Sequence, residues 1–168
     1  LPEELTIWTD TDYAGCKKTR KSTSGGVVMW GSHLIKSWSS TQSVIALSSG
    51  EAEYYGMVKG ASVGLGLQAV LSDFNIKVKL TLKSDATAAI AIASRRGLGK
   101  VRHIEVCQLW LQEKVRRGDI KVVKVGTSEN VADALTKFVS RESMSKHLTA
   151  TVQIARSGRH ALAPATEC

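Results

Sequence analysis

The sequence predicts an α/β protein in which a five-stranded mixed sheet carries helices on its faces, and three observations predict this class. Three short β-prone segments come first, and a glycine-serine pair joins the second to the third. Helical periodicity then starts near Ser48 and alternates with two further strand patterns. Sequential antiparallel strands followed by helical crossovers are typical of a mixed sheet in the α/β class.

The first three strands are expected at residues 5–9, 25–30 and 34–39. The first is short and β-prone and ends in Asp10. Gly31-Ser32 separates the other two and suits a tight turn, so these strands should form a hairpin.

The second half of the chain is expected to alternate strands with helices. Apolar residues alternate with lysine and threonine in residues 78–82, and a further strand is expected at 121–125. Helices are expected at residues 86–94 and from about residue 104 to a stop at Gly118. A last helix should begin at Thr127 or Ser128, with an apolar face formed by Val131, Ala134, Leu135 and Phe138.

The length and composition favour one folded domain. The chain has 168 residues, 43% of them hydrophobic, which is enough for a core without disulfides or a structural metal. Periodicity weakens after residue 140, so we expect a domain at residues 1–140 and a poorly ordered C-terminal extension at 141–168. The chain starts with Leu1, which suggests excision from a longer polypeptide.

Several classes of protein are excluded by composition. No apolar run reaches the ~18 residues of a membrane helix, and no basic segment leads an apolar one as in a secretory signal. The three cysteines, Cys16, Cys107 and Cys168, are far apart and suggest neither a disulfide framework nor a zinc site, which fits a reducing compartment. The net charge of +8 favours a polyanionic partner, nucleic acid above all, although it could serve solubility alone.

Two predicted strands end in an aspartate, at Asp10 and Asp85. Function in α/β sheets gathers at the carboxyl ends of strands, so the two carboxylates could meet in one site. Each also has a structural alternative, because Asp10 could open a loop and Asp85 could cap the following helix.

Two glutamates at the start of the helix near Ser48 should have different roles. Residues two apart on a helix point about 200° away from each other, so Glu51 and Glu53 face different ways. Ser48-x-x-Glu51 is a capping-box pattern, which gives Glu51 a structural role. Glu53 shares a stripe with Gly56, Gly60 and Gly64, which would bring the helix close to the sheet, so this glutamate needs a metal ion or a buried Arg or Lys as partner.

Asp133 is the weakest candidate by pattern. It falls opposite the apolar face of the expected last helix, so periodicity favours plain solvent exposure. Glu129 lies one turn earlier on the same side, as a second carboxylate or as a favourable charge near the helix N-terminus.

Six sequence blocks occur in order between residues 5 and 140: TDTDYAG at 9–15, RKSTSGG at 20–26, KSWSSTQSVIALSSGEAEYYG at 36–56, KSDATAAIAIA at 83–93, VRHIEV at 101–106 and ENVADALTK at 129–137. Taken together, these blocks resemble the ribonuclease H domain that ends the polymerase polyprotein of copia-type retrotransposons. The resemblance implies a ribonuclease H-like fold, in which three antiparallel strands precede two parallel crossovers and the central strand carries the first acid.

The resemblance also implies a chemistry and a set of residues. It suggests an endonuclease that cleaves the RNA strand of RNA–DNA hybrids with two Mg²⁺ ions, or Mn²⁺ as a substitute, bound by Asp10, Glu53, Asp85 and Asp133. Two hard cations can activate water and stabilise the phosphate and the leaving oxygen during phosphodiester hydrolysis. For Asp133 the resemblance overrules the periodicity argument.

Substrate contacts are expected in two basic loops, at Lys21, Ser22 and Thr23 and at Arg102 and His103. Solvated surface charge is the alternative for each cation. Many ribonucleases H carry a histidine between the fifth strand and the last helix, and here that loop reads Gly-Thr-Ser at 126–128. This chain could therefore turn over more slowly or use another group.

The implied partners are an RNA–DNA hybrid and a reverse transcriptase domain of the same polyprotein, with no membrane and no small-molecule cofactor. A cytoplasmic location in a virus-like particle follows from the same resemblance. Two alternatives remain open: an inactive module of this fold that positions nucleic acid for an attached polymerase, and another nuclease or an integrase that shares the fold.

Overall fold

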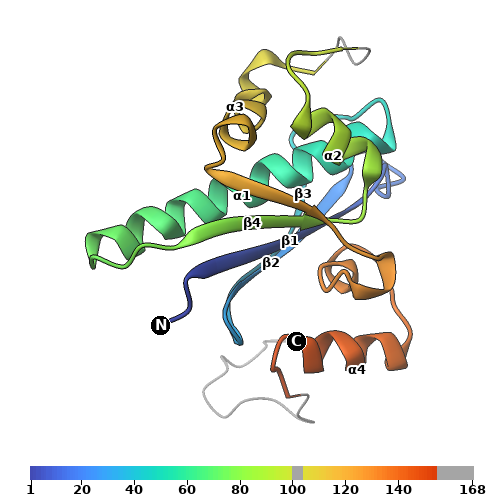
Figure 1. Cartoon of the computed structure of the whole chain (residues 1–168). Coiled ribbons are helices and arrows are strands. Elements are labelled where there is room, and N and C mark those ends of the chain that lie inside the picture. The colour runs from blue at the N-terminus through green and yellow to red at the C-terminus, as the bar shows by residue number, and fades with distance from the viewer. Residues whose placement is uncertain (100–103, 155–168) are drawn as a thin grey trace, which may run out of the picture.

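The computed structural model describes residues 1–99 and 104–154 and contains one five-stranded sheet flanked by helices (Figure 1). Its strands are β1 Glu4–Asp12, β2 Thr23–Trp30, β3 His33–Thr41, β4 Lys79–Ser84 and β5 Ile120–Lys124. Its α-helices are α1 Ser49–Asp73, α2 Thr87–Ser94, α3 Trp110–Arg117 and α4 Arg141–Ala150. Short 3-10 turns are η1 Val106–Gln108, η2 Thr127–Glu129 and η3 Asp133–Leu135.

The strand order is β3-β2-β1-β4-β5, so β1 lies at the centre. It pairs antiparallel with β2 and parallel with β4, and β5 is parallel to β4. Strands β2 and β3 form the expected hairpin through Gly31, whose φ of 59° is the left-handed conformation that glycine adopts readily. The predicted mixed sheet with three antiparallel strands and two parallel crossovers is therefore confirmed.

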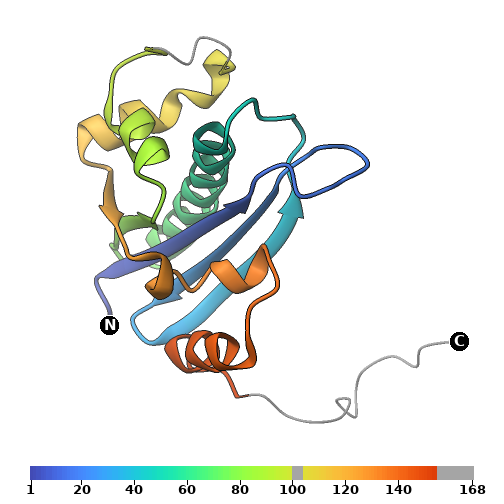
Figure 2. The same cartoon turned by 90° about the vertical axis from the view of Figure 1, so that its right-hand side faces the viewer.

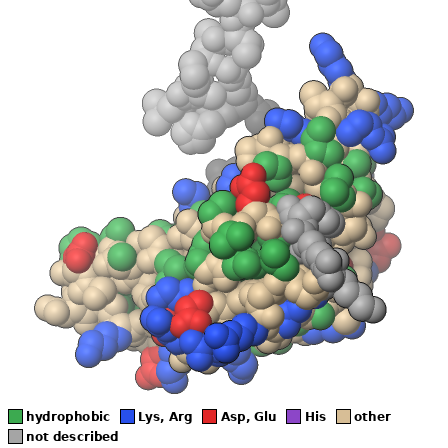
Figure 3. Space-filling view, turned by 90° about the horizontal axis from the view of Figure 1, so that it is seen from above, with side chains coloured by type: hydrophobic (Ala, Val, Ile, Leu, Met, Phe, Trp, Pro, Cys, Tyr) green, Lys and Arg blue, Asp and Glu red, His purple; other side chains and the backbone are tan. Residues whose placement is uncertain are grey.

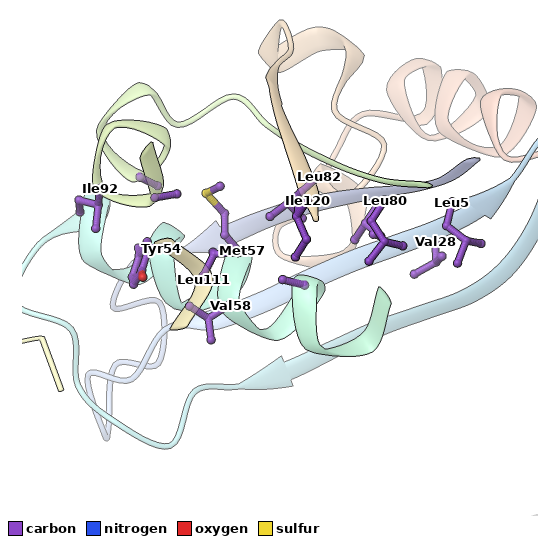
Figure 4. Close-up of a cluster of buried hydrophobic side chains, with 14 of the residues drawn as sticks. Leu5, Val28, Tyr54, Met57, Val58, Leu80, Leu82, Ile92, Leu111 and Ile120 are labelled. Atoms are coloured by element: carbon purple, nitrogen blue, oxygen red, sulfur yellow. The ribbon is translucent and has the colours of Figure 1, made fainter. Parts of the chain in front are cut away.

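The helices cover both faces of the sheet. Helices α1, α2 and α3 lie on one face, and η3 and α4 lie on the other (Figure 2). The main core fills the space between the sheet and the first group of helices, and Figure 4 shows its buried side chains, among them Leu5, Val28, Tyr54, Met57, Val58, Leu80, Leu82, Ile92, Leu111 and Ile120. A smaller cluster around Val27, Met29 and Val131 lies on the opposite face.

The glycine stripe of α1 lies directly over the central strand, as its spacing predicts. A Cβ atom on Gly56 would come within 2.5 Å of Thr11 Oγ1, and one on Gly60 within 2.5 Å of Thr9 Cγ2. Because no side chain larger than hydrogen fits there, the helix backbone packs close to β1. This close contact brings the first turns of α1 to the carboxyl end of β1.

The expected last helix at residues 127–138 is wrong. Two 3-10 turns stand in its place, and Phe138, predicted on its apolar face, is fully exposed. The reason is Asn130, which is completely buried and donates its side-chain amide to Thr9 O at 3.0 Å. A buried side chain tied to the sheet in this way pulls the backbone inward and interrupts a regular helix.

Two other segments differ from expectation. The helix expected from about residue 104 begins only at Trp110, although it ends at Gly118 as predicted, with φ 79° in the left-handed region. The extension expected to be poorly ordered from residue 141 starts with helix α4, whose N-cap Ser140 accepts a hydrogen bond from Ser143 N. Within residues 1–99 and 104–154, no helix has both the length and the apolar character required to cross a bilayer.

Candidate active site

The site forms where β1 and β4 part. Their parallel pairing ends at Trp8 and Lys83, but β1 continues to Asp12, so the edge of β1 that faced β4 loses its partner strand. Two side chains take over its backbone groups: Asn130 Nδ2 donates to Thr9 O, and Thr11 N donates to Glu53 Oε1 at 3.3 Å. We call this opening the β1–β4 fork.

Asp10 lies in the fork between these two threonines. Successive side chains of a strand point to opposite faces. Thr9 and Thr11 point toward α1, and Asp10 points toward η3, where Thr136 Oγ1 donates a hydrogen bond to its Oδ2. Asp10 is 3% exposed, so it is a buried carboxylate and does not merely open a loop.

Asp85 directly follows β4 on the other side of the fork. The N-cap of α2 is Ala86, so Asp85 does not serve as the cap that the sequence allowed. Its Oδ1 accepts a hydrogen bond of 3.4 Å from Asn130 Nδ2, the same amide that bonds to Thr9. Asn130 therefore links the segment at 126–132 to both strands of the fork.

Three carboxylates meet in this opening. Asp10, Glu53 and Asp85 each offer an oxygen, and these atoms all lie within 4.8 Å of one another. The residues come from a strand, a helix and the end of another strand, so only the folded chain brings them together. We call them the carboxylate trio.

Burial, together with like charges at this distance, raises the pKa of two members of the trio, Glu53 and Asp10. Burial, reinforced by the charges of Asp10 and Asp85, raises the pKa of Glu53 to about 8. Burial also raises the pKa of Asp10, while the hydrogen bond from Thr136 and the charge of Lys137 act in the opposite direction. Among the described residues, Glu53 Oε2 is buried and has no hydrogen-bond donor.

Asp133 lies beside the trio and outside it. Its charge contributes to the raised pKa of Asp10, which places the two carboxylates in the same electrostatic environment. Its side chain is 14% exposed and forms an ion pair with Lys137, so the expectation of plain solvent exposure is wrong. Periodicity failed here because residues 133–135 form a 3-10 turn and no α-helix.

Sequence comparison finds relatives among retrovirus-related Pol polyproteins of plant transposons, whereas no family model matches the chain. The chain is 32% identical over 136 residues to the polyprotein of transposon TNT 1-94 from Nicotiana tabacum, and 31% identical over 141 residues to that of transposon RE1 from Arabidopsis thaliana. These alignments cover 80% and 82% of the chain but only 10% of each polyprotein. The chain is thus homologous to a segment of about a tenth of these relatives.

Solved structures with a similar architecture identify the fold of the chain. The N-terminal RNase H domain of Rv2228c from Mycobacterium tuberculosis superposes with a TM-score of 0.56 at 19% identity, covering 88% of this chain and 97% of that one. LC11-RNase H1 from compost in complex with an RNA/DNA hybrid gives 0.52 at 16% identity, covering 86% and 99%. The protease-reverse transcriptase of prototype foamy virus gives 0.51 at 12% identity, covering 81% and 21%.

The chain has the ribonuclease H fold. Its similarity to a segment of Pol polyproteins and its fold agree with the family resemblance of its sequence blocks. In this ribonuclease H-like domain, Asp10 lies on the central strand, where that resemblance placed the first acid, and the trio forms around it.

The two glutamates of α1 differ as predicted, with one detail changed. Ser48 Oγ accepts from Glu51 N at 3.2 Å, which is one half of a capping box. Glu51 Oε2 accepts from Leu47 N at 2.9 Å, one residue before the expected Ser48 amide, and its Oε1 accepts from the Tyr55 hydroxyl at 2.8 Å. Glu51 therefore stabilises the start of α1, and Glu53 belongs to the trio.

The five residues expected to contact the substrate have different outcomes in the structure. Ser22 is fully buried and its Oγ accepts from Ala14 N at 3.0 Å, so its hydroxyl supports the loop after β1 and is not available to a substrate. Lys21, in the same loop, and Thr23, the first residue of β2, are partly exposed and remain candidates. Arg102 and His103 lie outside the described residues.

Lys and Arg side chains form several groups on the face seen in Figure 3.

Sequence reasoning missed three side chains of the site: Asn130, Thr136 and Lys137. All three contact an acid of the ribonuclease H-like site, and all belong to the segment for which a helix was expected. The sequence offered no signal for them, because the complete burial of Asn130 and its need for tertiary hydrogen-bond partners become evident only in the folded chain.

Proposed function

We propose that this ribonuclease H-like domain is a metal-dependent endonuclease that hydrolyses the RNA strand of RNA–DNA hybrids. The observation that carries the proposal is the carboxylate trio at the β1–β4 fork, whose oxygens lie within 4.8 Å of one another. A module that only binds nucleic acid has no use for three converging carboxylates, since they repel a phosphate backbone.

The trio fits a divalent metal. Glu53 Oε2 is buried with no donor among the described residues, and burial together with the charges of Asp10 and Asp85 raises the pKa of Glu53 to about 8. The ionised form of this carboxyl is therefore destabilised, and a bound cation would stabilise it. An all-oxygen donor set open to solvent on one side suits Mg²⁺, with Mn²⁺ as a substitute. Asp10, Glu53 and Asp85 would hold the metal, and Asp133 would serve a second ion. Two such ions supply an activated water and offset charge on the phosphate and the leaving oxygen.

The protein's own residues hold this arrangement in place. Thr136 donates to Asp10 Oδ2, and Asn130 donates to Asp85 Oδ1 at 3.4 Å, so each of these carboxylates is oriented by one hydrogen bond. Thr11 N donates to Glu53 Oε1, whereas Oε2 is buried and has no hydrogen-bond donor among the described residues. Because donors from the fold orient the carboxylates before any ligand binds, little reorganisation is needed on binding.

The biological setting follows from the relatives. Since the chain corresponds to a segment of retrovirus-related Pol polyproteins, we propose that it acts beside a reverse transcriptase domain of the same polyprotein. A hybrid made by such a polymerase is the expected substrate, in a cytoplasmic virus-like particle. The basic loop of Lys17, Lys18, Arg20 and Lys21 next to β1 can contact its phosphates.

A cleavage assay tests the proposal. The purified chain is incubated with a labelled RNA–DNA hybrid and Mg²⁺, beside the Asp10→Asn and Asp85→Asn variants. We expect wild type to cut only the RNA strand, EDTA to abolish cutting, and both variants to lose it. A wild-type chain that binds the hybrid and leaves the RNA intact would identify an inactive binding module, and variants that cut as well as wild type would refute the assigned site.

A further inference from the structure

Two consecutive residues after η3 contact two different acids of the site. Thr136 Oγ1 donates to Asp10 Oδ2, and Lys137 Nζ forms an ion pair with Asp133 Oδ1. The segment is held against the sheet at Gly25, where a Cβ would come within 2.8 Å of Leu135 Cβ and of Thr136 Cγ2. The backbone of this segment is therefore fixed, and with it the point from which the flexible Lys137 side chain extends.

The two partners of the ion pair differ in exposure. The Asp133 side chain is 14% exposed and the Lys137 side chain is 48% exposed. Lysine carries a compact ammonium on a flexible four-carbon stem. The acid is consequently held in the site, whereas the ammonium can leave it without a change in the fold.

Lys137 also acts on the trio. Its positive charge stabilises the ionised forms of Asp10 and Glu53, and the charges of Asp10, Asp133 and Asp85 in turn stabilise the ammonium. A lysine with this position balances part of the negative charge that a divalent ion would balance. An ammonium and a divalent ion that bind the same Asp133 carboxylate repel each other, so each weakens the binding of the other.

We propose that Lys137 is a built-in counter-cation of the acidic site, which competes with a divalent ion for Asp133 in the metal-free protein and pairs with a phosphate oxygen of the hybrid once that ion is bound. The first half of this inference rests on the proposed metal site, and the second half rests on the proposed cleavage of a hybrid. No proton is transferred, since the ammonium exchanges one anionic partner for another. This exchange would make metal binding and substrate binding cooperative. A bound divalent ion displaces the Lys137 ammonium from Asp133, and the substrate phosphate then provides the ammonium with a new anionic partner.

The metal half is tested without substrate. Mg²⁺ is titrated into the full chain, and the half-saturating concentration is read from thermal stabilisation. We expect Lys137→Gln to lower that concentration about fivefold by removing the competing charge, and Lys137→Arg to behave as wild type. The matched control is Lys146→Gln, which removes another i,i+4 ion pair, with Glu142 on α4, and should change nothing. A Lys137→Gln variant whose Mg²⁺ requirement is unchanged or increased overturns the proposal.

The substrate half is tested with the hybrid at saturating Mg²⁺. Loss of a charge-assisted contact to the phosphate should lower kcat about tenfold in Lys137→Gln, with most activity retained in Lys137→Arg. A merely structural role would not combine tighter metal binding with slower cleavage. Lys137→Gln cleaving as fast as wild type overturns the phosphate contact. Should wild type fail to cleave at all, the proposed function fails, and the Mg²⁺ titration still decides whether Lys137 competes with the metal.

Discussion

The β1–β4 fork and the segment from residue 126 to residue 137 supply acids to the same site, but they are built in different ways. In the fork, the carboxylate trio comes from the ends of regular strands and the first turns of a long helix. In the segment, Asp133 stands on a 3-10 turn that is held by side-chain hydrogen bonds from Asn130 and Thr136. One part of the site is positioned by backbone ladders and the other by a few polar side chains.

This difference indicates how strongly the position of each acid is constrained by its surroundings. The fork is bonded to the core through β1, β4 and α1, so its carboxylates should tolerate little change. The segment depends on a small number of contacts, so its acid should be more adaptable and less demanding. The predictions below separate the two regions, beginning with the largest expected effect.

The largest effect is expected in the fork at Glu53. Glu53→Gln keeps the shape of the side chain and removes its charge, so cleavage of a hybrid with Mg²⁺ should fall roughly a thousandfold. Glu51→Gln is the matched control on the same helix, and should retain cleavage while losing about 1–2 kcal/mol of stability, because Glu51 accepts hydrogen bonds from Leu47 and Tyr55. Equal losses of cleavage in both variants would remove the distinction between a metal ligand and a helix cap.

A large effect of pH is expected on the metal-free fork. The folded pKa of Glu53 is raised to about 8 from 4.5, and that of Asp10 is raised as well, so the folded state binds these protons more tightly than the unfolded state. The resulting stabilisation is present below the unfolded pKa and is lost as the pH rises toward 8, by a few kcal/mol at most.

Thermal unfolding measured between about pH 5 and pH 9 checks this trend. Mg²⁺ should flatten the loss, because the metal stabilises the ionised carboxylates, and Glu53→Gln should flatten it without metal. A melting temperature that stays constant or rises over this range in the metal-free wild type would contradict the raised pKa values.

A moderate effect is expected at the junction of the two regions. Asn130→Ala removes the buried amide that joins Thr9 and Asp85, which should reduce stability by about 2–3 kcal/mol in urea denaturation. Cleavage should fall too, since Asp85 loses its hydrogen-bond partner. If this variant unfolds and cleaves as wild type does, the segment is held to the sheet by other contacts.

The smallest effect is expected at Asp133. Asp133→Asn should lower cleavage only about tenfold at limiting Mg²⁺, and added Mg²⁺ should restore part of it, because this acid lies outside the trio. Kinetics at several Mg²⁺ concentrations measure the recovery, with Asp10→Asn as the unrecoverable reference. A complete and Mg²⁺-independent loss would place Asp133 on an equal footing with the trio.

The sequence by itself determined the order of strands and helices up to β5, the glycine-lined contact of α1 and the different directions of Glu51 and Glu53. These features follow from local rules, since side-chain direction in a regular helix or strand is set by its period. The aspartates at strand ends could be found in the same way, as Asp10 and Asp85 show.

Only the tertiary structure decided the rest. It replaced the expected last helix by two 3-10 turns, formed α4 where poor order was expected, buried Ser22, and placed Thr136 and Lys137 against the acids. The physical reason is that these features depend on contacts between residues distant in sequence, above all the bond from Asn130 to Thr9 across 121 positions. Local periodicity contains no information about such a contact, which exists only when β1 and the segment after β5 lie side by side.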